Sequence, residues 1–253
     1  MNIKAIAVDL DNTMLRSDET ISDYSLAAME RIRATGVLLF VATGRSRMQA
    51  DEFIRQLHPD GVAAFCGAFV EVGNRVLADG RISCENAIDL ANALTERYGK
   101  VVGVEVDDVW HVNNPAYRDR APVVGDFTGL PTGAIGRLSV MSDDYRVFAG
   151  FDFACYGAKM IYGTDAHIHC IYPANADKYH GVQMLCEHFG ISPGDVAAFG
   201  DDYNDVNMLQ QCGIGIAMGN AADVAKTAAD EICGSNDSDG VVRWLLAKLE
   251  LKF

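Results

Sequence analysis

Short runs of apolar residues alternate with amphipathic segments in the first and last thirds of the chain. Strands are predicted where apolar residues are consecutive, at 3–8, 37–42, 62–66, 196–200 and 214–217. Helices are predicted where apolar residues recur at three- and four-residue spacing, at 23–35, 46–57, 178–189 and 239–250. Strands that are apolar throughout are buried on both faces, which is typical of a parallel sheet covered by helices on both sides. The pattern therefore predicts an α/β fold with a Rossmann-like, three-layer core.

The middle of the chain, from about 83 to 174, has a different pattern. It begins with one amphipathic helix whose apolar face runs from Ala87 to Tyr98. Partly alternating, strand-like segments follow, separated by loops rich in Gly, Pro and Asp. This pattern predicts an antiparallel sheet with a helix or two on one face. We therefore expect a core of residues 1–82 and 175–253, interrupted by an inserted α+β domain of residues 83–174.

The composition is that of an ordinary soluble protein, with 49% of the 253 residues hydrophobic and 22% charged. No apolar run approaches the roughly 20 residues that span a bilayer, and the N-terminal residues lack the apolar stretch of a signal peptide. The seven cysteines are scattered without metal-ligand spacing, so we expect reduced thiols in a cytoplasmic protein. The net charge of −14 argues against nucleic acid or an anionic membrane as a partner. This charge would also repel a small anionic substrate, so a site for one would have to be locally positive. A bound cation could make it so.

Carboxylates follow two of the predicted strands. Asp9 and Asp11 come at the end of the first strand, and GDDYND (200–205) contains the end of the strand 196–200. Ligands bind beyond the carboxyl ends of strands in an open parallel sheet, so these side chains are expected to converge. Buried carboxylates in that number need a counter-charge. Mg²⁺ prefers oxygen ligands, few carboxylates, water and a substrate phosphate, and is the predicted cation.

Anion donors are predicted at the same edge of the sheet. Thr43 and Gly44 offer a hydroxyl and a backbone N–H where the predicted helix 46–57 begins. Lys178 opens another predicted helix and supplies a positive charge. Phosphoryl transfer needs a nucleophile, an acid–base group, a cation and donors around the phosphoryl oxygens. The sequence provides candidates for each.

Four ordered motifs resemble those of the haloacid dehalogenase-like (HAD) phosphatase superfamily. They are DLDNT from Asp9, ATGR from Ala42, the helix-opening Lys178, and GDDYND from Gly200. The tail, GIAMGNAADVAKTAADEIC followed by SNDSDGVV, is similar to the Cof-type branch, which carries a large α/β cap of class IIB between the second and third motifs. The resemblance covers nearly the whole chain. It implies an Mg²⁺-dependent phosphatase acting on a small phosphorylated metabolite such as a sugar phosphate or a similar phosphomonoester, as a monomer or a small homo-oligomer.

The resemblance also implies roles for individual residues. Asp9 would form an aspartyl-phosphate, and Asp11 would protonate the leaving oxygen and then activate water. The ligands of Mg²⁺ would be Asp9, the backbone carbonyl of Asp11, Asp201 and, directly or through water, Asp205. The groups that bind the phosphoryl group or the substrate would be Thr43, Gly44, Lys178, Asn204 and Asn220.

Some positions depart from the family pattern or have two interpretations. Asn12 stands where Gly is frequent, but Asn tolerates the left-handed conformation, so the turn should form. Cys66 replaces an expected Asn, which puts a polar substrate contact there in doubt. Arg45 could reach the substrate, or pair with a carboxylate. His167 and His169 alternate along a predicted strand with Asp165 nearby, a pattern that could suggest metal ligands, but a half-exposed strand of the inserted domain is the favoured interpretation. A phosphomutase and a non-catalytic phospho-acceptor remain alternatives, although Asp11 argues against the latter.

Overall fold

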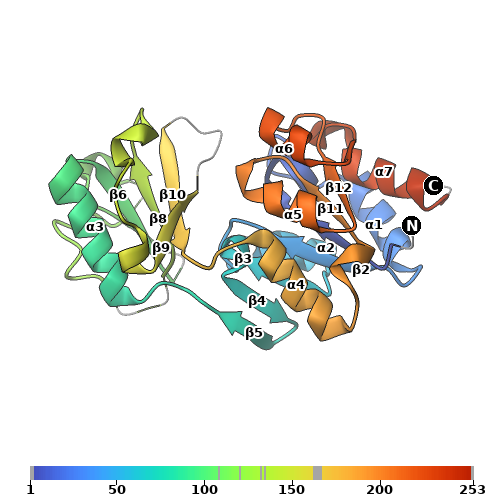
Figure 1. The fold of residues 1–253 in the computed structure, drawn as a ribbon, viewed down its shortest axis with the longest axis horizontal. Coiled ribbons are helices and arrows are strands. Elements are labelled where there is room, and N and C mark those ends of the chain that lie inside the picture. The colour runs from blue at the N-terminus through green and yellow to red at the C-terminus, as the bar shows by residue number, and fades with distance from the viewer. Residues whose placement is uncertain are drawn as a thin grey trace. The chain divides into compact units, whose positions relative to one another are not determined.

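The computed structural model describes residues 3–107, 109–119, 121–131, 133, 135–161 and 167–251. The chain divides into two units, each with its own sheet (Figure 1). One unit comprises Met1–Asp79 and Asp177–Phe253, and the other comprises Gly80–Ala176. The first unit is therefore assembled from both ends of the chain, with the second inserted into it.

The first unit is built on a sheet whose strand order is β13-β12-β11-β1-β2-β3-β4-β5. Its strands are β1 (Ala5–Val8), β2 (Leu38–Ala42), β3 (Gly61–Ala64), β4 (Phe69–Val72), β5 (Arg75–Asp79), β11 (Val196–Gly200), β12 (Ile214–Ala217) and β13 (Glu231–Ile232). The strands from β13 to β3 pair in parallel, and β4 and β5 continue antiparallel. The central strand β1 thus has its carboxyl end between those of β11 and β2.

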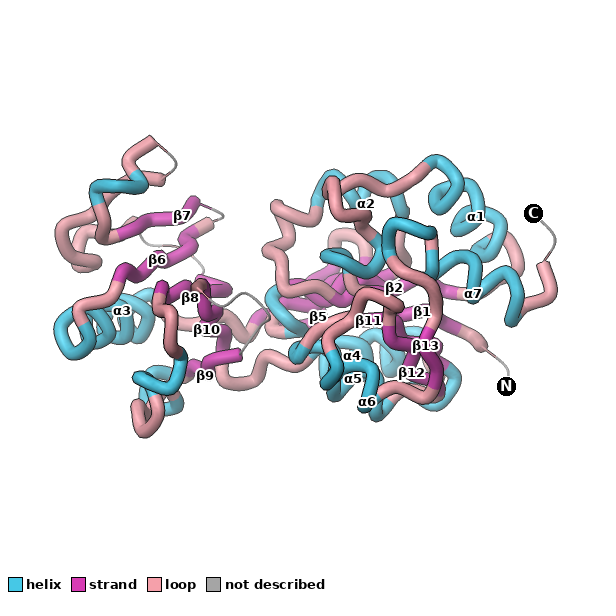
Figure 2. The backbone as a smooth tube through the Cα atoms, turned by 90° about the horizontal axis from the view of Figure 1, so that it is seen from above, coloured by secondary structure: helices cyan, strands magenta, loops and turns pink. Residues whose placement is uncertain are grey.

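Helices cover both faces of this sheet (Figure 2). They are α1 (Asp23–Arg33), α2 (Asp51–Leu57), α4 (Lys178–Phe189), α5 (Val206–Gln211), α6 (Asp223–Ala228) and α7 (Gly240–Lys248). Alternate residues of β1 point to opposite faces. Ile6 and Val8 pack in the same cluster as apolar residues of α1, α2 and α7, whereas Ala5 and Ala7 pack with those of α4 and α5. The predicted three-layer α/β core is confirmed.

The second unit is an antiparallel sheet with a helix on one face. Its strands are β6 (Val101–Val106), β7 (Val109–Val112), β8 (Ile135–Met141), β9 (Ala158–Ile161) and β10 (Ile168–Pro173), in the order β7-β6-β8-β10-β9. Helix α3 (Cys84–Tyr98) places Leu90 and Leu94 in one apolar cluster with Val102, Val104 and Leu138. The α+β character expected of the insertion is confirmed.

Two element boundaries differ from the prediction in ways that affect the site. The helix expected at 46–57 begins only at Asp51, after a turn at 47–50. The hydroxyl of Ser46 accepts the N–H of Gln49 and its carbonyl accepts the N–H of Ala50, so Ser46 caps a single turn that precedes α2. The strand expected at 62–66 ends at Ala64, because the next residues adopt the left-handed conformation.

That left-handed turn consists of Phe65, Cys66 and Gly67, with φ of 49°, 52° and 84°. The N–H groups of Phe65 and Cys66 donate to the carbonyls of Arg45 and Thr43, at 2.9 and 2.8 Å. A Cβ on Gly67 would lie 2.2 Å from the carbonyl oxygen of Asp177, the residue before α4. The turn therefore joins the loop after β2 to the beginning of α4.

Gly67→Ala should lower the free energy of unfolding by more than an alanine usually does at a glycine in the left-handed conformation. An alanine in this conformation costs about 1–2 kcal/mol, and here its methyl group would also overlap the backbone at Asp177. Gly190→Ala is the matched control, because Gly190 has φ of 67° with no atom within 4 Å of the added Cβ. The measurement is the free energy of unfolding in urea. Equal losses in the two variants would contradict the close approach at Gly67.

Candidate active site

Asp9 lies directly after β1, at the carboxyl end of the central strand, and is 4% exposed. The chain then makes a tight turn over residues 10–14, closed by hydrogen bonds from Met14 N–H to the carbonyl of Asp9 and from Leu15 N–H to that of Leu10. Asn12 has φ of 53° within this turn, so the predicted left-handed conformation is confirmed. The turn reverses the chain immediately after the buried carboxylate.

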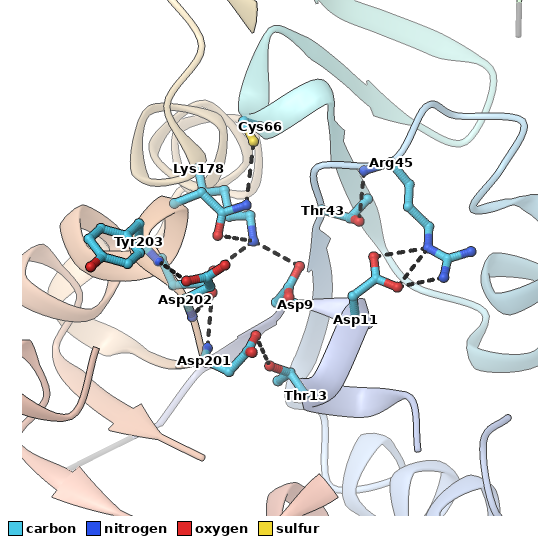
Figure 3. A network of polar contacts seen from close by, with 12 residues as sticks. Asp9, Asp11, Thr13, Thr43, Arg45, Cys66, Lys178, Asp201, Asp202 and Tyr203 are labelled. Atoms are coloured by element: carbon cyan, nitrogen blue, oxygen red, sulfur yellow. Dashed lines mark hydrogen bonds and ion pairs between the residues drawn. The ribbon is translucent and has the colours of Figure 1, made fainter. Parts of the chain in front are cut away.

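Three buried carboxylates gather at this end of the sheet (Figure 3). Oxygen atoms of Asp9, Asp201 and Asp205 lie within 4.8 Å of one another. One oxygen of Asp205 accepts the N–H groups of Asp201 and Asp202, at 2.9 and 3.1 Å. A Cβ on Gly200 would lie 2.4 Å from Cγ of Asp205, so only glycine at the end of β11 lets this side chain fold back. The loop after β11 is therefore shaped to bring Asp201 and Asp205 to Asp9.

Lys178 is the cation among these carboxylates (Figure 3). Its Nζ lies 2.8 Å from Asp9 and 2.7 Å from Asp205, and its side chain is fully buried. Asp177 fixes the first turn of α4 by accepting the N–H groups of Tyr179 and His180. Burial by itself would lower the pKa of Lys178, but the charges of Asp205 and Asp9 outweigh it and raise the pKa well above its usual value. Lys178 thus stays charged.

One lysine does not balance three buried carboxylates. Burial raises the pKa of Asp9 well above its ordinary value, with Asp205 and Asp201 adding to the effect against Lys178. Burial likewise raises the pKa of Asp201 to about 7, with the charge of Asp205 adding to the effect, although Thr13 donates its hydroxyl to Asp201 at 3.2 Å. The cluster offers oxygen atoms alone and carries excess negative charge. These residues fit a hard divalent cation such as Mg²⁺.

Asp11 is bound differently from the three buried carboxylates. The Arg45 guanidinium holds it through both oxygens, with Nε 3.0 Å from each and Nη2 2.5 Å from Oδ1 (Figure 3). Arg45 in turn lies over the ring of Phe53, 5.1 Å from its centroid. Of the two interpretations of Arg45, carboxylate pairing is the one found, and its partner is the candidate acid–base residue. Sequence reasoning did not identify this partner, because 34 positions separate the two residues.

The phosphate-binding candidates occupy different positions. Thr43 is buried at the end of β2, and its hydroxyl accepts the N–H of Arg45 at 3.1 Å. Because α2 begins only at Asp51, Thr43 and Gly44 precede the single turn capped by Ser46 and not α2 itself, which corrects the expected helix boundary. Asn204 is next to Lys178, with Oδ1 3.3 Å from Nζ. Thr43, Asn204 and Lys178 thus come from three separate segments of the first unit.

Two further residues singled out in the sequence, Asn220 and Cys66, contact other residues of the chain. Asn220 donates to the carbonyl of Asn12 and accepts the N–H of Asn236, at 2.8 and 2.9 Å. Cys66 is buried, and its sulfur is 3.7 Å from the amide nitrogen of Asn204.

The histidines of the second unit are not brought into a candidate metal group in the part of the chain that the structure describes. His167 pairs with Asp143 at 2.8 Å, and Nε2 of the buried His169 lies 2.9 Å from the carbonyl oxygen of Ser142. Asp165, which was considered with them, lies outside the described residues.

The sequence profile of one family, described as haloacid dehalogenase-like hydrolase, matches residues 6–128 and 146–245. The chain belongs to this family. Its predicted place in the superfamily and the prediction of an enzyme that acts by hydrolysis are confirmed. The matched residues include the three carboxylates and Lys178.

Similar proteins extend over the full length of this HAD family member. A 5-amino-6-(5-phospho-D-ribitylamino)uracil phosphatase of Bacillus subtilis is 28% identical over 95% of each chain. A pyridoxal phosphate phosphatase of Escherichia coli is 25% identical over 98% of this chain and 100% of its own. A solved structure described as a subclass IIB sugar phosphatase of the HAD superfamily is 24% identical, with a TM-score of 0.81 over 98% of this chain and 100% of its own. This last similarity concerns the fold, including the inserted domain.

Among the described residues of this HAD protein, no helix combines the length and apolar character needed to cross a bilayer.

The metal-free protein should lose stability as the pH rises from 5 to 8. A carboxyl group whose pKa is higher in the folded protein than in the unfolded chain stabilises the fold while protonated. For Asp201 that contribution is fully present below about pH 4 and is lost as the pH rises through about 7. The expected loss is on the order of a few kcal/mol.

The measurement is the free energy of unfolding in EDTA at both pH values. Asp201→Asn should flatten the pH dependence, whereas Asp18→Asn should not, because hydrogen bonds from Thr20 lower the pKa of the exposed Asp18. The same slope in wild type and Asp201→Asn would show that Asp201 does not titrate in this range.

Proposed function

We propose that this protein is an Mg²⁺-dependent phosphatase that hydrolyses a small phosphorylated metabolite through an aspartyl-phosphate on Asp9. The observation that carries the proposal is the buried Lys178 held between Asp9 and Asp205, with Asp201 completing the group. Lys178, 2.8 Å away, opposes the rise that burial causes in the pKa of Asp9, and a bound divalent cation would add to that effect and favour the carboxylate that a nucleophile needs. The family match and the relatives named as phosphatases support the same reaction.

Asp9 is the proposed nucleophile because it is held at a strand end by a short main-chain turn. Its backbone N–H donates to the carbonyl of Phe199 in β11, and one of its carboxylate oxygens is bound by Lys178. Such a rigid support places an attacking oxygen with little reorganisation. In the proposed first step Asp9 Oδ attacks phosphorus, and the bond from phosphorus to the leaving oxygen breaks.

The metal ligands are proposed to be Asp9, the backbone carbonyl of Asp11 and Asp201, with Asp205 either a direct ligand or bound through water. When bound, Mg²⁺ would neutralise charge that develops on the phosphoryl oxygens. The protein donors proposed for the same oxygens are the Thr43 hydroxyl, the Gly44 N–H, Lys178 and the Asn204 amide. Asn220 is proposed to hold the main chain near this set, since one amide hydrogen donates to the carbonyl of Asn12 and its oxygen accepts the N–H of Asn236.

Asp11 is proposed to protonate the leaving oxygen and later to take a proton from the attacking water. Its side chain is 48% exposed, so it can reach a substrate that enters from solvent. A carboxylate bound at both oxygens by Arg45 cannot at the same time donate a proton to the leaving group. The arrangement with Arg45 is therefore proposed to be the resting one, which Asp11 leaves when it acts as an acid.

The substrate is proposed to be a phosphomonoester of metabolite size, such as a sugar phosphate, a phosphorylated flavin precursor or pyridoxal phosphate. These classes are named for the relatives and for the structural neighbour. The predicted core, 1–82 with 175–253, is proposed to perform the chemistry, and the predicted cap, 83–174, to select the leaving group. A cytoplasmic location agrees with the seven cysteines, all of which are free thiols.

The decisive test is release of inorganic phosphate from a panel of phosphorylated metabolites with Mg²⁺. Asp9→Asn should abolish turnover and leave the protein folded, because the exchange removes the nucleophile and keeps the size of the side chain. Asp18→Asn is the control, since it removes an equal charge from an exposed position in the same segment. Phosphate release by pure Asp9→Asn would refute the covalent mechanism. Isomerised sugar phosphate in place of free phosphate would identify a phosphomutase.

Asp11→Asn should slow turnover by about 10²–10⁴-fold, which is the usual contribution of general acid–base catalysis. The loss should be larger for an alkyl phosphate than for an aryl phosphate, whose leaving group needs little protonation. The measurement is kcat on both substrates under conditions where chemistry limits the rate. An equal loss on the two substrates, with an unchanged lifetime of the phospho-enzyme, would remove Asp11 from this role.

Activity should depend on Mg²⁺ and be inhibited by Ca²⁺. The carboxylates are few and close together, which suits the octahedral coordination of Mg²⁺ better than the larger and looser shell of Ca²⁺. The measurement is the rate after EDTA treatment, followed by titration with each ion, with thermal unfolding as a second readout. Full activity in EDTA would exclude the metal-dependent mechanism.

A further inference from the structure

Two carbonyl groups of the turn that follows Asp9 accept side-chain amides in place of backbone N–H groups. The N–H groups of Met14 and Leu15 close the turn onto Asp9 and Leu10. The carbonyls of Asn12 and Leu15 point elsewhere, and each accepts a side-chain amide from the far end of the chain. Because Asn12 is in the left-handed conformation, the turn includes a residue that is not at its backbone energy minimum. Such a residue depends on its surroundings to hold it.

The two amides belong to Asn220 and Asn236, more than 200 positions away along the chain. Asn220 Nδ2 donates to the Asn12 carbonyl at 2.8 Å, and Asn236 Nδ2 donates to the Leu15 carbonyl at 3.0 Å. The backbone N–H of Asn236 donates to Asn220 Oδ1 at 2.9 Å, so the two asparagines are also bonded to each other. Asn236 is 5% exposed, and its amide is therefore shielded from competing water.

The segment that carries Asn236 is itself held tightly. Gly240 N–H donates to the carbonyl of Ser235, and a Cβ on Gly240 would lie 2.2 Å from the carbonyl oxygen of Gly234. Gly219 N–H donates to the same Gly234 carbonyl. The two asparagines thus lie in two loops, one after β12 and one after β13, that are hydrogen-bonded to each other.

We infer that Asn220 and Asn236 are two positioning residues. Their amides hold the backbone of residues 10–15 and thereby orient the side chains of Asp9 and Asp11. Asn220 acts through the backbone of Asn12 and does not bind the phosphoryl group. The expected effect of these asparagines on turnover rests on the proposed function. Their expected effect on the turn itself does not depend on any activity. Neither asparagine touches the carboxylates, so both are positioning residues.

The experiment compares Asn220→Ala and Asn236→Ala with wild type in the full-length protein. Both variants should lower kcat by about 10- to 100-fold, the scale of a small misplacement of reacting groups. The inhibition constant for inorganic phosphate should change by less than about twofold, since no phosphate ligand is lost. Hydrogen exchange, followed by mass spectrometry, should become faster in the peptide that contains Met14 and Leu15. Should Asn236→Ala fail to fold because its site is buried, the exposed Asn220 still provides the test.

Asp237→Ala is the matched control. Asp237 lies in the same loop and accepts the N–H and hydroxyl of Ser17, which is beyond the turn. The Asp237→Ala variant should leave kcat and the rate of hydrogen exchange in the 10–15 peptide unchanged. A weaker inhibition by phosphate in Asn220→Ala, with unchanged exchange, would overturn the inference and make Asn220 a phosphate ligand. Hydrogen exchange in the 10–15 peptide tests the positioning role even if the protein turns over no phosphomonoester. Failure of this inference can therefore be told apart from failure of the proposed function.

Discussion

The ion pairs of Lys178 with Asp9 and Asp205 are the interaction on which the rest of the first unit's site depends. Removing Lys178 would leave the buried carboxylates without their cation, and an uncompensated buried charge is strongly destabilising. The pairs join the first strand, the beginning of α4 and the loop after β11, which are far apart in sequence. One buried cation therefore holds these three chain segments together.

Close backbone approaches make this geometry possible. Gly67 and Gly181 let the turn after β3 lie against the first turn of α4, since a Cβ on Gly181 would be 2.9 Å from Cα of Gly67. Gly200 leaves the space into which Asp205 folds. These glycines carry no chemistry, but Gly67 and Gly181 remove a steric barrier between two backbone segments, and Gly200 removes one between the backbone and the side chain of Asp205. The left-handed conformations of Cys66 and Asn12 have a similar cause, because both occur where the chain must reverse beside the buried charges.

Electrostatic balance divides the acidic residues into two sets. Asp9, Asp201 and Asp205 share one lysine and retain excess negative charge, which makes their group suited to a divalent cation. Asp11 is separated from them by its pairing with Arg45, a cation that comes from the neighbouring loop. The same four carboxylates in one environment would repel one another. Distributing them over two cations lets the proposed nucleophile and the proposed acid–base group lie in one short turn.

The sequence by itself determined the order of the elements and which strand ends carry chemistry. Uninterrupted apolar runs, as in Ala5–Val8 and Val196–Gly200, predict buried parallel strands, and the residue after each such strand must emerge at the same edge of the sheet. The position of Asp9 follows from that rule, and the helix that begins at Lys178 follows from the three- and four-residue spacing of its apolar residues. Local propensity also accounts for Asn12, since few residues tolerate its backbone conformation.

Only the tertiary structure decided the partners of these side chains. The bonds of Asp11 to Arg45 and of Asn220 to Asn12 join residues 34 and 208 positions apart, and no periodicity in the sequence encodes such distances. The start of α2 at Asp51 was also beyond the pattern, because the N–H of Asp51 bonds to the carbonyl of Met48, three residues back, which separates the helix from the turn before it. Hydrophobic periodicity reports which face of an element is buried. It does not report which polar groups the packed elements bring within hydrogen-bonding distance, and that depends on the loops, glycines and buried charges that meet only in the folded chain.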